Sequence, residues 1–185
     1  MEIDAKKSED KRLNSLVAIT VVVVSVFLAV SKLKDDNIVR RMDFVKADSV
    51  DIWNEYQAER IKLHNDENTL SALKMDPPKD ARAATGEEAR LAAAIAKYKL
   101  QSDQLAAKAR GTDDLYRAIE YRHDQFDIED ALLSITLALT GVAALAEAYW
   151  LLMTGWGFAT FGIFMGLAGI FQWPIHPEAL ARFLG

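Results

Sequence analysis

The sequence predicts an all-α protein with three transmembrane helices and a long, coiled-coil-like helical hairpin outside the membrane, between the first and second of them. Two observations predict this class. The charged residues lie in blocks separated by long apolar runs, and apolar residues recur at helical spacing within the central charged block. A bilayer requires unbroken apolar runs, whereas a soluble domain distributes its apolar residues periodically. The expected order is a polar N-terminal tail (1–12), a transmembrane helix (13–33), the extramembrane hairpin (34–130), two transmembrane helices (131–153 and 156–173) and a C-terminal tail (174–185).

The first apolar run, 13–33, is long enough to cross about 30 Å of hydrocarbon. Its β-branched residues suit a strand in water, but a lone strand in lipid leaves its backbone unsatisfied, so we expect a helix. A cleaved signal peptide is the alternative, because four basic residues precede the run and Ala29–Ser31 resembles a cleavage site. The length of the run favours an uncleaved anchor. The four basic residues are Lys6, Lys7, Lys11 and Arg12.

The last two apolar runs are expected to form a tight antiparallel hairpin, because only Thr154–Gly157 separates them. Small residues recur on them at helical spacing, and such faces allow close helix packing in lipid. This packing serves the hairpin itself, an interface between copies, or both. The expected helix-packing residues are Gly162, Gly166, Gly169, Ala144 and Ala148.

Apart from Lys32 at the end of the first predicted span, Glu147 is the only charged residue within the predicted spans. Carboxylates inside a membrane are candidate functional groups, so a role in transport or proton movement is one hypothesis for Glu147. A carboxyl that reaches the headgroup region, or that bonds a neighbouring helix, is the other.

The central block predicts two helical arms. The first has no Pro or Gly until Asp76–Pro78 ends it, and the second is expected to start at about Gly86, with Thr85 as its N-cap and one interruption at Gly111. In the second arm, positions spaced alternately by three and four residues form a mainly apolar seam, typical of coiled-coil packing. The seam comprises Leu91, Ile95, Tyr98, Ser102, Leu105, Ala109, Thr112, Tyr116, Ile119, His123 and Phe126. The matching seam of the first arm comprises Ile38, Met42, Val45, Ser49, Ile52 and Tyr56.

No catalytic constellation is found. There are no cysteines, the net charge is −5, and the block 34–130 is acidic, which disfavours nucleic acid as a partner. Glu120 and His123 have the spacing of one half of a di-iron site, but the second half is missing. We therefore expect no catalytic, cofactor-binding or metal residues, no cofactor and no enzyme activity. A metalloenzyme using Glu120 and His123 remains a remote alternative.

Two stretches, Asp51–Lys62 and Arg122–Leu133, resemble the family called domain of unknown function 4337. The residues that carry the resemblance are Trp53, Tyr56, Gln57, Arg122, His123, Phe126 and Asp127. The resemblance implies a multi-pass protein of the bacterial inner membrane with three spans. It implies no established activity. Family members often carry basic residues between the last two spans, and Thr154–Gly157 carries none.

Orientation therefore depends on the residues around the first span. Four basic residues precede it and two, Lys32 and Lys34, lie at its end or just beyond it, which favours a cytoplasmic N-terminus and a periplasmic central block. The hairpin is too polar to supply a large core. We thus expect a non-enzymatic oligomeric scaffold, or an accessory subunit of a larger membrane complex, in contact with membrane lipid. An oligomeric channel or transport component using Glu147 is the alternative.

Overall fold

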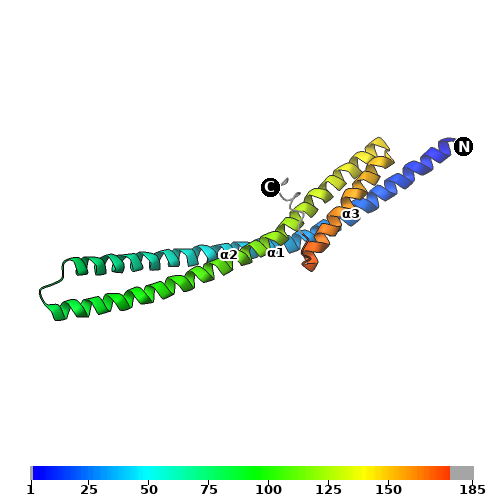
Figure 1. Cartoon of the computed structure of the whole chain (residues 1–185). Coiled ribbons are helices and arrows are strands. Elements are labelled where there is room, and N and C mark those ends of the chain that lie inside the picture. Colours follow the sequence, from blue (N-terminus) through cyan, green and yellow to red (C-terminus); the bar gives the residue numbers. More distant parts are fainter. Residues whose placement is uncertain (1, 176–185) are drawn as a thin grey trace. The chain divides into compact units, whose positions relative to one another are not determined.

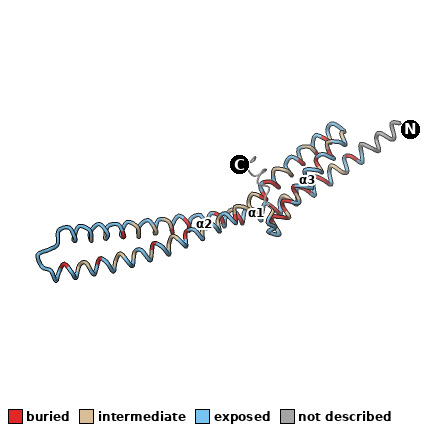
Figure 2. Tube along the Cα trace, viewed as in Figure 1, coloured by how far each residue is buried: buried red, intermediate tan, exposed pale blue. Residues whose placement is uncertain are grey.

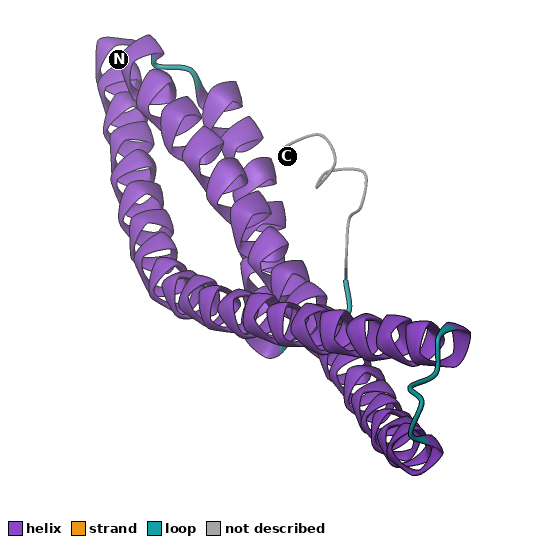
Figure 3. Cartoon of the chain, turned by 90° about the vertical axis from the view of Figure 1, so that its left-hand side faces the viewer, coloured by secondary structure: helices purple, strands orange, loops and turns teal. Residues whose placement is uncertain are grey.

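The structure, a computed structural model, describes residues 2–175, with side chains from Lys11 onward, and contains three helices in this range. They are α1 (Glu2–Met75), α2 (Ala81–Ala146) and α3 (Tyr149–Phe171) (Figure 1). Only short loops separate them, and the described part of the chain has no strand (Figure 3). All three helices are long and apolar enough to cross a membrane. The all-α fold class is therefore confirmed.

The chain divides into two compact units. The hairpin unit is Met42–Arg117, and the bundle unit combines the residues up to Arg41 with those from Ala118 onward. Both long helices contribute to both units, because neither α1 nor α2 is interrupted where one unit gives way to the other.

In the hairpin unit, α1 and α2 run antiparallel. Lys46 lies over the ring of Tyr116, 5.2 Å from its centroid, whereas Lys62, further along α1, lies 5.7 Å from the ring centroid of Tyr98, earlier in α2. Within this unit every position of the two predicted seams is buried or half-buried, and the buried residues recur along both arms (Figure 2). The 3–4 spacing thus identified the contacting faces of both arms.

The start of the second arm differs from the prediction. Helix α2 begins at Ala81, because the Asp80 carboxylate accepts hydrogen bonds from the backbone N–H groups of Arg82 at 3.0 Å and Ala83 at 3.3 Å. Thr85 is inside the helix and donates to the Ala81 carbonyl. Gly111 does not interrupt α2, because its helical conformation is accessible to any residue and the added backbone entropy costs only about 1 kcal/mol.

The bundle unit packs three helical segments together. Helix α3 is antiparallel to α2, since Thr136 donates to the Gly155 carbonyl at 3.1 Å while Gln125, earlier in α2, donates to the Trp173 carbonyl at 3.1 Å. It also contacts α1, where the indole N–H of Trp156 donates to the Thr20 hydroxyl at 2.9 Å.

The interior of the bundle unit contains polar side chains beside its apolar clusters. Several polar side chains are buried, namely Thr20, Ser31, Asp35, Gln125, Glu129, Thr136 and Thr140. Many large apolar side chains face outward, among them Ile19, Val22, Val23, Val26, Leu145, Trp150, Phe161 and Phe164. An apolar exterior around buried polar groups suits contact with lipid, where polar groups need partners inside the protein.

The turn between the last two apolar runs lies earlier than predicted. Helix α2 ends at Ala146, Glu147 adopts a φ of 50°, and the backbone N–H of Ala148 bonds to the Ala143 carbonyl at 3.1 Å. The prediction placed the turn at Thr154–Gly157, which is helical. Gly155 is instead a buried residue of α3, and its carbonyl accepts a hydrogen bond from the Thr136 hydroxyl of α2 at 3.1 Å.

Two residues singled out from the sequence, Glu147 and Ala148, have a different setting as a result. Glu147 lies in the turn and is exposed, not inside a helix. Ala148 precedes α3 in an extended conformation, so it does not share a helical face with Ala144.

Candidate functional site

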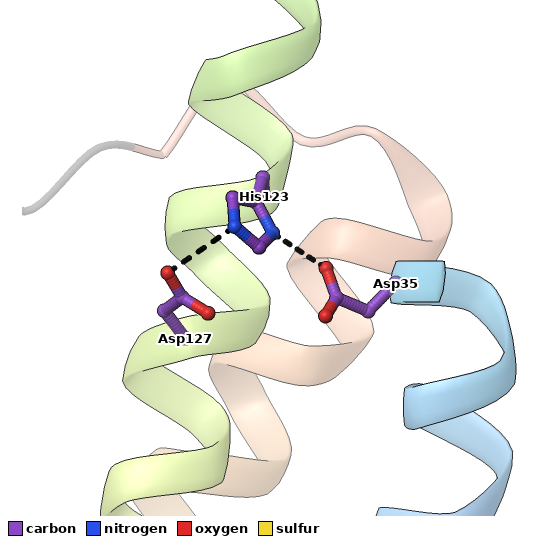
Figure 4. A group of neighbouring side chains, drawn as sticks. All are labelled: Asp35, His123 and Asp127. Carbon is purple, nitrogen blue, oxygen red and sulfur yellow. Dashed lines mark hydrogen bonds and ion pairs between the residues drawn. The ribbon is translucent and has the colours of Figure 1, made fainter. Parts of the chain in front are cut away.

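An ionic cluster lies between α1 and α2 in the bundle unit. It comprises Asp35 from α1 and His123 and Asp127 from α2 (Figure 4). Asp35 and His123 sit in the seam because each continues the 3–4 spacing of its helix, and Asp127 lies one turn after His123 on the same face. The helical register therefore forces charged groups into a contacting surface.

The imidazole of His123 bridges the two carboxylates. Its Nδ1 lies 2.6 Å from Asp35 Oδ1, a short hydrogen bond, and its Nε2 lies 3.5 Å from Asp127 Oδ2 (Figure 4). The Asp35 side chain is only 4% exposed, whereas that of Asp127 is 59% exposed. Lys32 binds the second oxygen of Asp35 at 3.2 Å. Both oxygens of the buried carboxylate therefore have partners, as a buried charge requires.

The electrostatic setting of Asp127 is different. Partial burial raises the pKa of its carboxyl, while the neighbouring His123 lowers it. Because this side chain is largely open to solvent, the burial effect on Asp127 is weak compared with that on a fully enclosed group.

A small cavity of about 20 Å³ adjoins the cluster and has room for a single water-sized occupant. Asp35 and Asp127 line it together with Ser31 and Glu129. Glu129 is 1% exposed, and neither of its carboxylate oxygens has a hydrogen-bond partner among the described residues. The Ser31 hydroxyl lies beside this carboxylate and is also buried without a well-formed hydrogen bond. Such groups are costly to bury, so this cavity is the most unusual polar site in the described part of the bundle unit.

The sequence analysis missed Glu129 and Asp35. Glu129 packs against Gly166, which has no side chain to occupy that space. A signal for both was available, because the 3–4 spacing continues beyond the seams as assigned: from Ile38 back to Asp35, and from Phe126 to Glu129 and the buried Leu133.

The two candidate carboxylates named from the sequence are not part of this site. Glu147 is in the exposed turn between α2 and α3. Glu120 precedes His123 by one turn, but both ring nitrogens of His123 face other carboxylates, those of Asp35 and Asp127. The half-site expected of a di-iron protein is therefore not assembled in this chain.

The family-motif residues of the hairpin unit form a second polar contact. The indole N–H of Trp53 donates to Asp113 at 3.2 Å, and the Ser49 hydroxyl donates to the same carboxylate at 2.6 Å. These two bonds hold the pKa of Asp113 below its usual range. Tyr56 packs edge-on against Trp53 with ring centroids 5.4 Å apart, and Gln57 is exposed.

The remaining motif residues and glycines lie at the contact between α2 and α3. Arg122 donates to the Gly169 carbonyl at 3.4 Å, and a Cβ on Gly169 would lie 2.8 Å from the ring of Phe126. A Cβ on Gly162 would lie 2.9 Å from the Leu133 side chain. The small-residue face of α3 is thus occupied by packing within the chain.

A family model describing a domain of unknown function (DUF4337) matches residues 13–172, which is most of the chain and covers α2, α3 and the part of α1 from Leu13 onward. The chain belongs to the DUF4337 family. No curated protein and no solved structure gives a significant match. The family resemblance inferred from the Trp53 and His123 motifs is therefore confirmed, and DUF4337 membership carries no assigned activity with it.

Proposed function

We propose that this DUF4337 protein is a non-enzymatic membrane scaffold that self-associates through its hairpin unit. The observation that carries the proposal is a pair of large apolar side chains that face away from the seam: Ile61 is 61% exposed and Leu100 is 60% exposed. Neither belongs to the apolar runs that account for the membrane spans.

The outward direction of both side chains follows from helix geometry. Ile61 is two residues from the buried Leu63, and Leu100 is two residues from the buried Ser102. At roughly 100° per residue, a two-residue step turns about 200° around a helix, so each side chain points away from the partner arm. The contact of Lys62 with Tyr98 places both at the same level of the hairpin.

A second copy of the chain is the occupant that we favour. Two helices bury only one seam, and this seam includes polar residues such as Ser49 and Ser102, so the unit gains little from its own core. When two copies lie side by side, Ile61 and Leu100 of one copy can pack against those of the other, which buries more apolar area without a different protein. Accessory binding to a different membrane protein is the variant of this proposal in which another chain supplies that area.

The composition of the bundle unit also supports the proposal of a membrane scaffold. The outward apolar side chains of the bundle unit suit lipid, and the three helices have the length and composition of spans. We propose the bacterial inner membrane as the location, with the N-terminus in the cytoplasm and the hairpin unit in the periplasm, on the basis of the basic residues before the first span.

The test is chemical crosslinking in native membranes followed by sizing of the full chain in mild detergent. Wild-type protein is expected as an oligomer, and Ile61→Lys combined with Leu100→Lys is expected to shift it toward the monomer. Asn65→Lys with Gln104→Lys is the matched control, since both residues are exposed and polar and lie on the same arms. A wild-type monomer that crosslinks to no other protein contradicts the proposal.

The channel alternative gains no structural support, because Glu147 lies in an exposed turn and not on an inward helical face. Its own test is proton flux in liposomes containing wild-type protein or the Glu147→Gln variant. Flux that the substitution abolishes would favour the channel over the scaffold.

A further inference from the structure

We propose that His123 and Asp127 form a binding site for one divalent transition-metal ion, with Asp35 as the positioning residue that orients the histidine. This site is independent of self-association through the hairpin unit. It departs from the expectation of no metal residues that the sequence suggested.

The spacing of the two ligand atoms fits a shared metal ion. His123 Nε2 and Asp127 Oδ2 are 3.5 Å apart. Zinc bonds to histidine nitrogen and carboxylate oxygen are about 2.0–2.2 Å long. With both bonds at about 2.1 Å, a separation of 3.5 Å corresponds to a ligand–metal–ligand angle of roughly 110°, close to the tetrahedral value.

The other ring nitrogen of His123, Nδ1, already makes a hydrogen bond. Nδ1 lies 2.6 Å from the buried Asp35 carboxylate, so it carries the proton and donates it to that carboxylate. In the neutral ring Nε2 then presents its lone pair toward Asp127. Metal-binding histidines commonly have this arrangement, in which a carboxylate on the far nitrogen fixes the tautomer and the orientation of the ring.

A proton shared between His123 and Asp127 fits the distance less well. Charge-assisted N–H···O bonds are usually about 2.7–2.9 Å long, and the observed separation is 3.5 Å. A metal ion bonded to both atoms matches this spacing better than a hydrogen bond does.

The adjoining cavity supplies the second, independent observation. It has room for one water-sized occupant and is lined by Asp127 and by Glu129, whose buried carboxylate has no partner among the described residues. Water in this cavity can complete the coordination sphere. Lys32 pairs with Asp35 at 3.2 Å and also lines this cavity.

The donor set selects the class of metal. Imidazole nitrogen with a carboxylate suits zinc, cobalt and nickel, whereas magnesium and calcium prefer oxygen ligands alone. Zn²⁺ should therefore bind in the presence of excess Mg²⁺.

The experiment is a Zn²⁺ titration of the full, tag-free chain in mild detergent, in competition with a chromophoric chelator. One Zn²⁺ per chain is expected, lost in His123→Ala and in Asp127→Asn. Asp35→Asn should weaken Zn²⁺ affinity by about 10–100-fold while retaining the stoichiometry. The matched control is His64→Ala, because His64 and Glu67 form another histidine–carboxylate pair, 3.1 Å apart, that is exposed and has no buried carboxylate behind the ring.

Several results would overturn the metal site. They are the absence of Zn²⁺ binding by helical wild-type protein, equal binding by the Asp127→Asn variant, and displacement by Mg²⁺ at equal concentration. If His123→Ala unfolds, wild-type protein loaded with Co²⁺ decides the matter: an intense visible band indicates tetrahedral coordination, whereas the weak spectrum of octahedral Co²⁺ contradicts the proposed geometry.

Discussion

The glycines of α3 allow a sharp test of the packing in the bundle unit. Replacing any helical glycine by alanine removes backbone freedom from the unfolded chain and gains up to about 1 kcal/mol. At Gly157 a new Cβ meets nothing within 4 Å, so only this gain applies. At Gly162 the same Cβ would lie 2.9 Å from Leu133 and 3.2 Å from Leu132, closer than side chains tolerate.

The difference between the two variants isolates the cost of overpacking. Extra methyl groups in a packed core usually cost about 1–3 kcal/mol, and in a chain of this size each kcal/mol shifts Tm by roughly 2–4 °C. Gly162→Ala is therefore expected to unfold roughly 2–12 °C below Gly157→Ala. Gly166→Ala is also expected to be less stable than Gly157→Ala, because its Cβ would meet the Glu129 carboxylate and lie 2.9 Å from the ring of Phe27.

The assay is thermal unfolding in one mild detergent, followed by far-UV circular dichroism, with Gly155→Ala as the intermediate case. A Cβ at Gly155 would make ordinary contacts at 3.6 Å, so its stability should lie between the other variants. Equal Tm values for Gly157→Ala and Gly162→Ala would refute the close approach of α2 and α3.

Three further predictions concern single contacts. Glu147→Gly should raise the free energy of unfolding by about 1 kcal/mol, because a non-glycine residue at a φ of 50° is strained, and chemical denaturation should show no such gain for Glu147→Gln. Asp80→Ala should cost about 1 kcal/mol of helix stability by removing the N-cap of α2, seen as faster amide exchange in its first turn, and unchanged exchange would argue against the cap. Because Ser49 and Trp53 hold the pKa of Asp113 low, the native state favours the ionised form of this carboxyl. The resulting stability is present above the unfolded pKa of about 4 and is lost as the pH falls through the lower native pKa. The Tm of Asp113→Asn should therefore depend less on pH in an acid titration, and curves identical to those of the wild type would contradict these bonds.

The sequence predicted the parts of the fold that depend on local spacing. The seam from Leu91 to Tyr116 and its partner from Met42 to Tyr56 are buried or half-buried in the hairpin unit, because a 3–4 alternation places residues on one helical face whatever the partner is. The break after Met75 likewise follows from Pro77 and Pro78, which cannot continue a helix.

The predicted position of the turn between α2 and α3 was wrong for a physical reason. Gly155 and Gly157 have the composition of a turn, but both lie inside α3, where Gly155 is buried against α2. Glu147 was read as an interruption inside a span, whereas its polarity marks the turn itself. Composition alone does not distinguish a glycine that bends the chain from one that packs against a neighbouring helix.

The ionic cluster depends on register between distant segments, which single-sequence reasoning does not provide. His123 contacts Asp35 although 88 positions of sequence separate them, and predicting this contact requires the register of α1 against α2. The seams contained part of the information, since the second seam already includes His123 and the first reaches Asp35 when it is extended by one step. Asp127 alone is within local reach of His123.

The valine-rich face of α1 has a consequence for how the protein is made. Val21, Val22, Val23 and Val26 all face outward in the helix, and such β-branched, uncharged stretches favour strands and intermolecular pairing in water. The segment adopts its helix where a low-dielectric solvent forbids unpaired backbone groups. We therefore expect this segment to need insertion into a bilayer, and chains that remain in water are expected to aggregate.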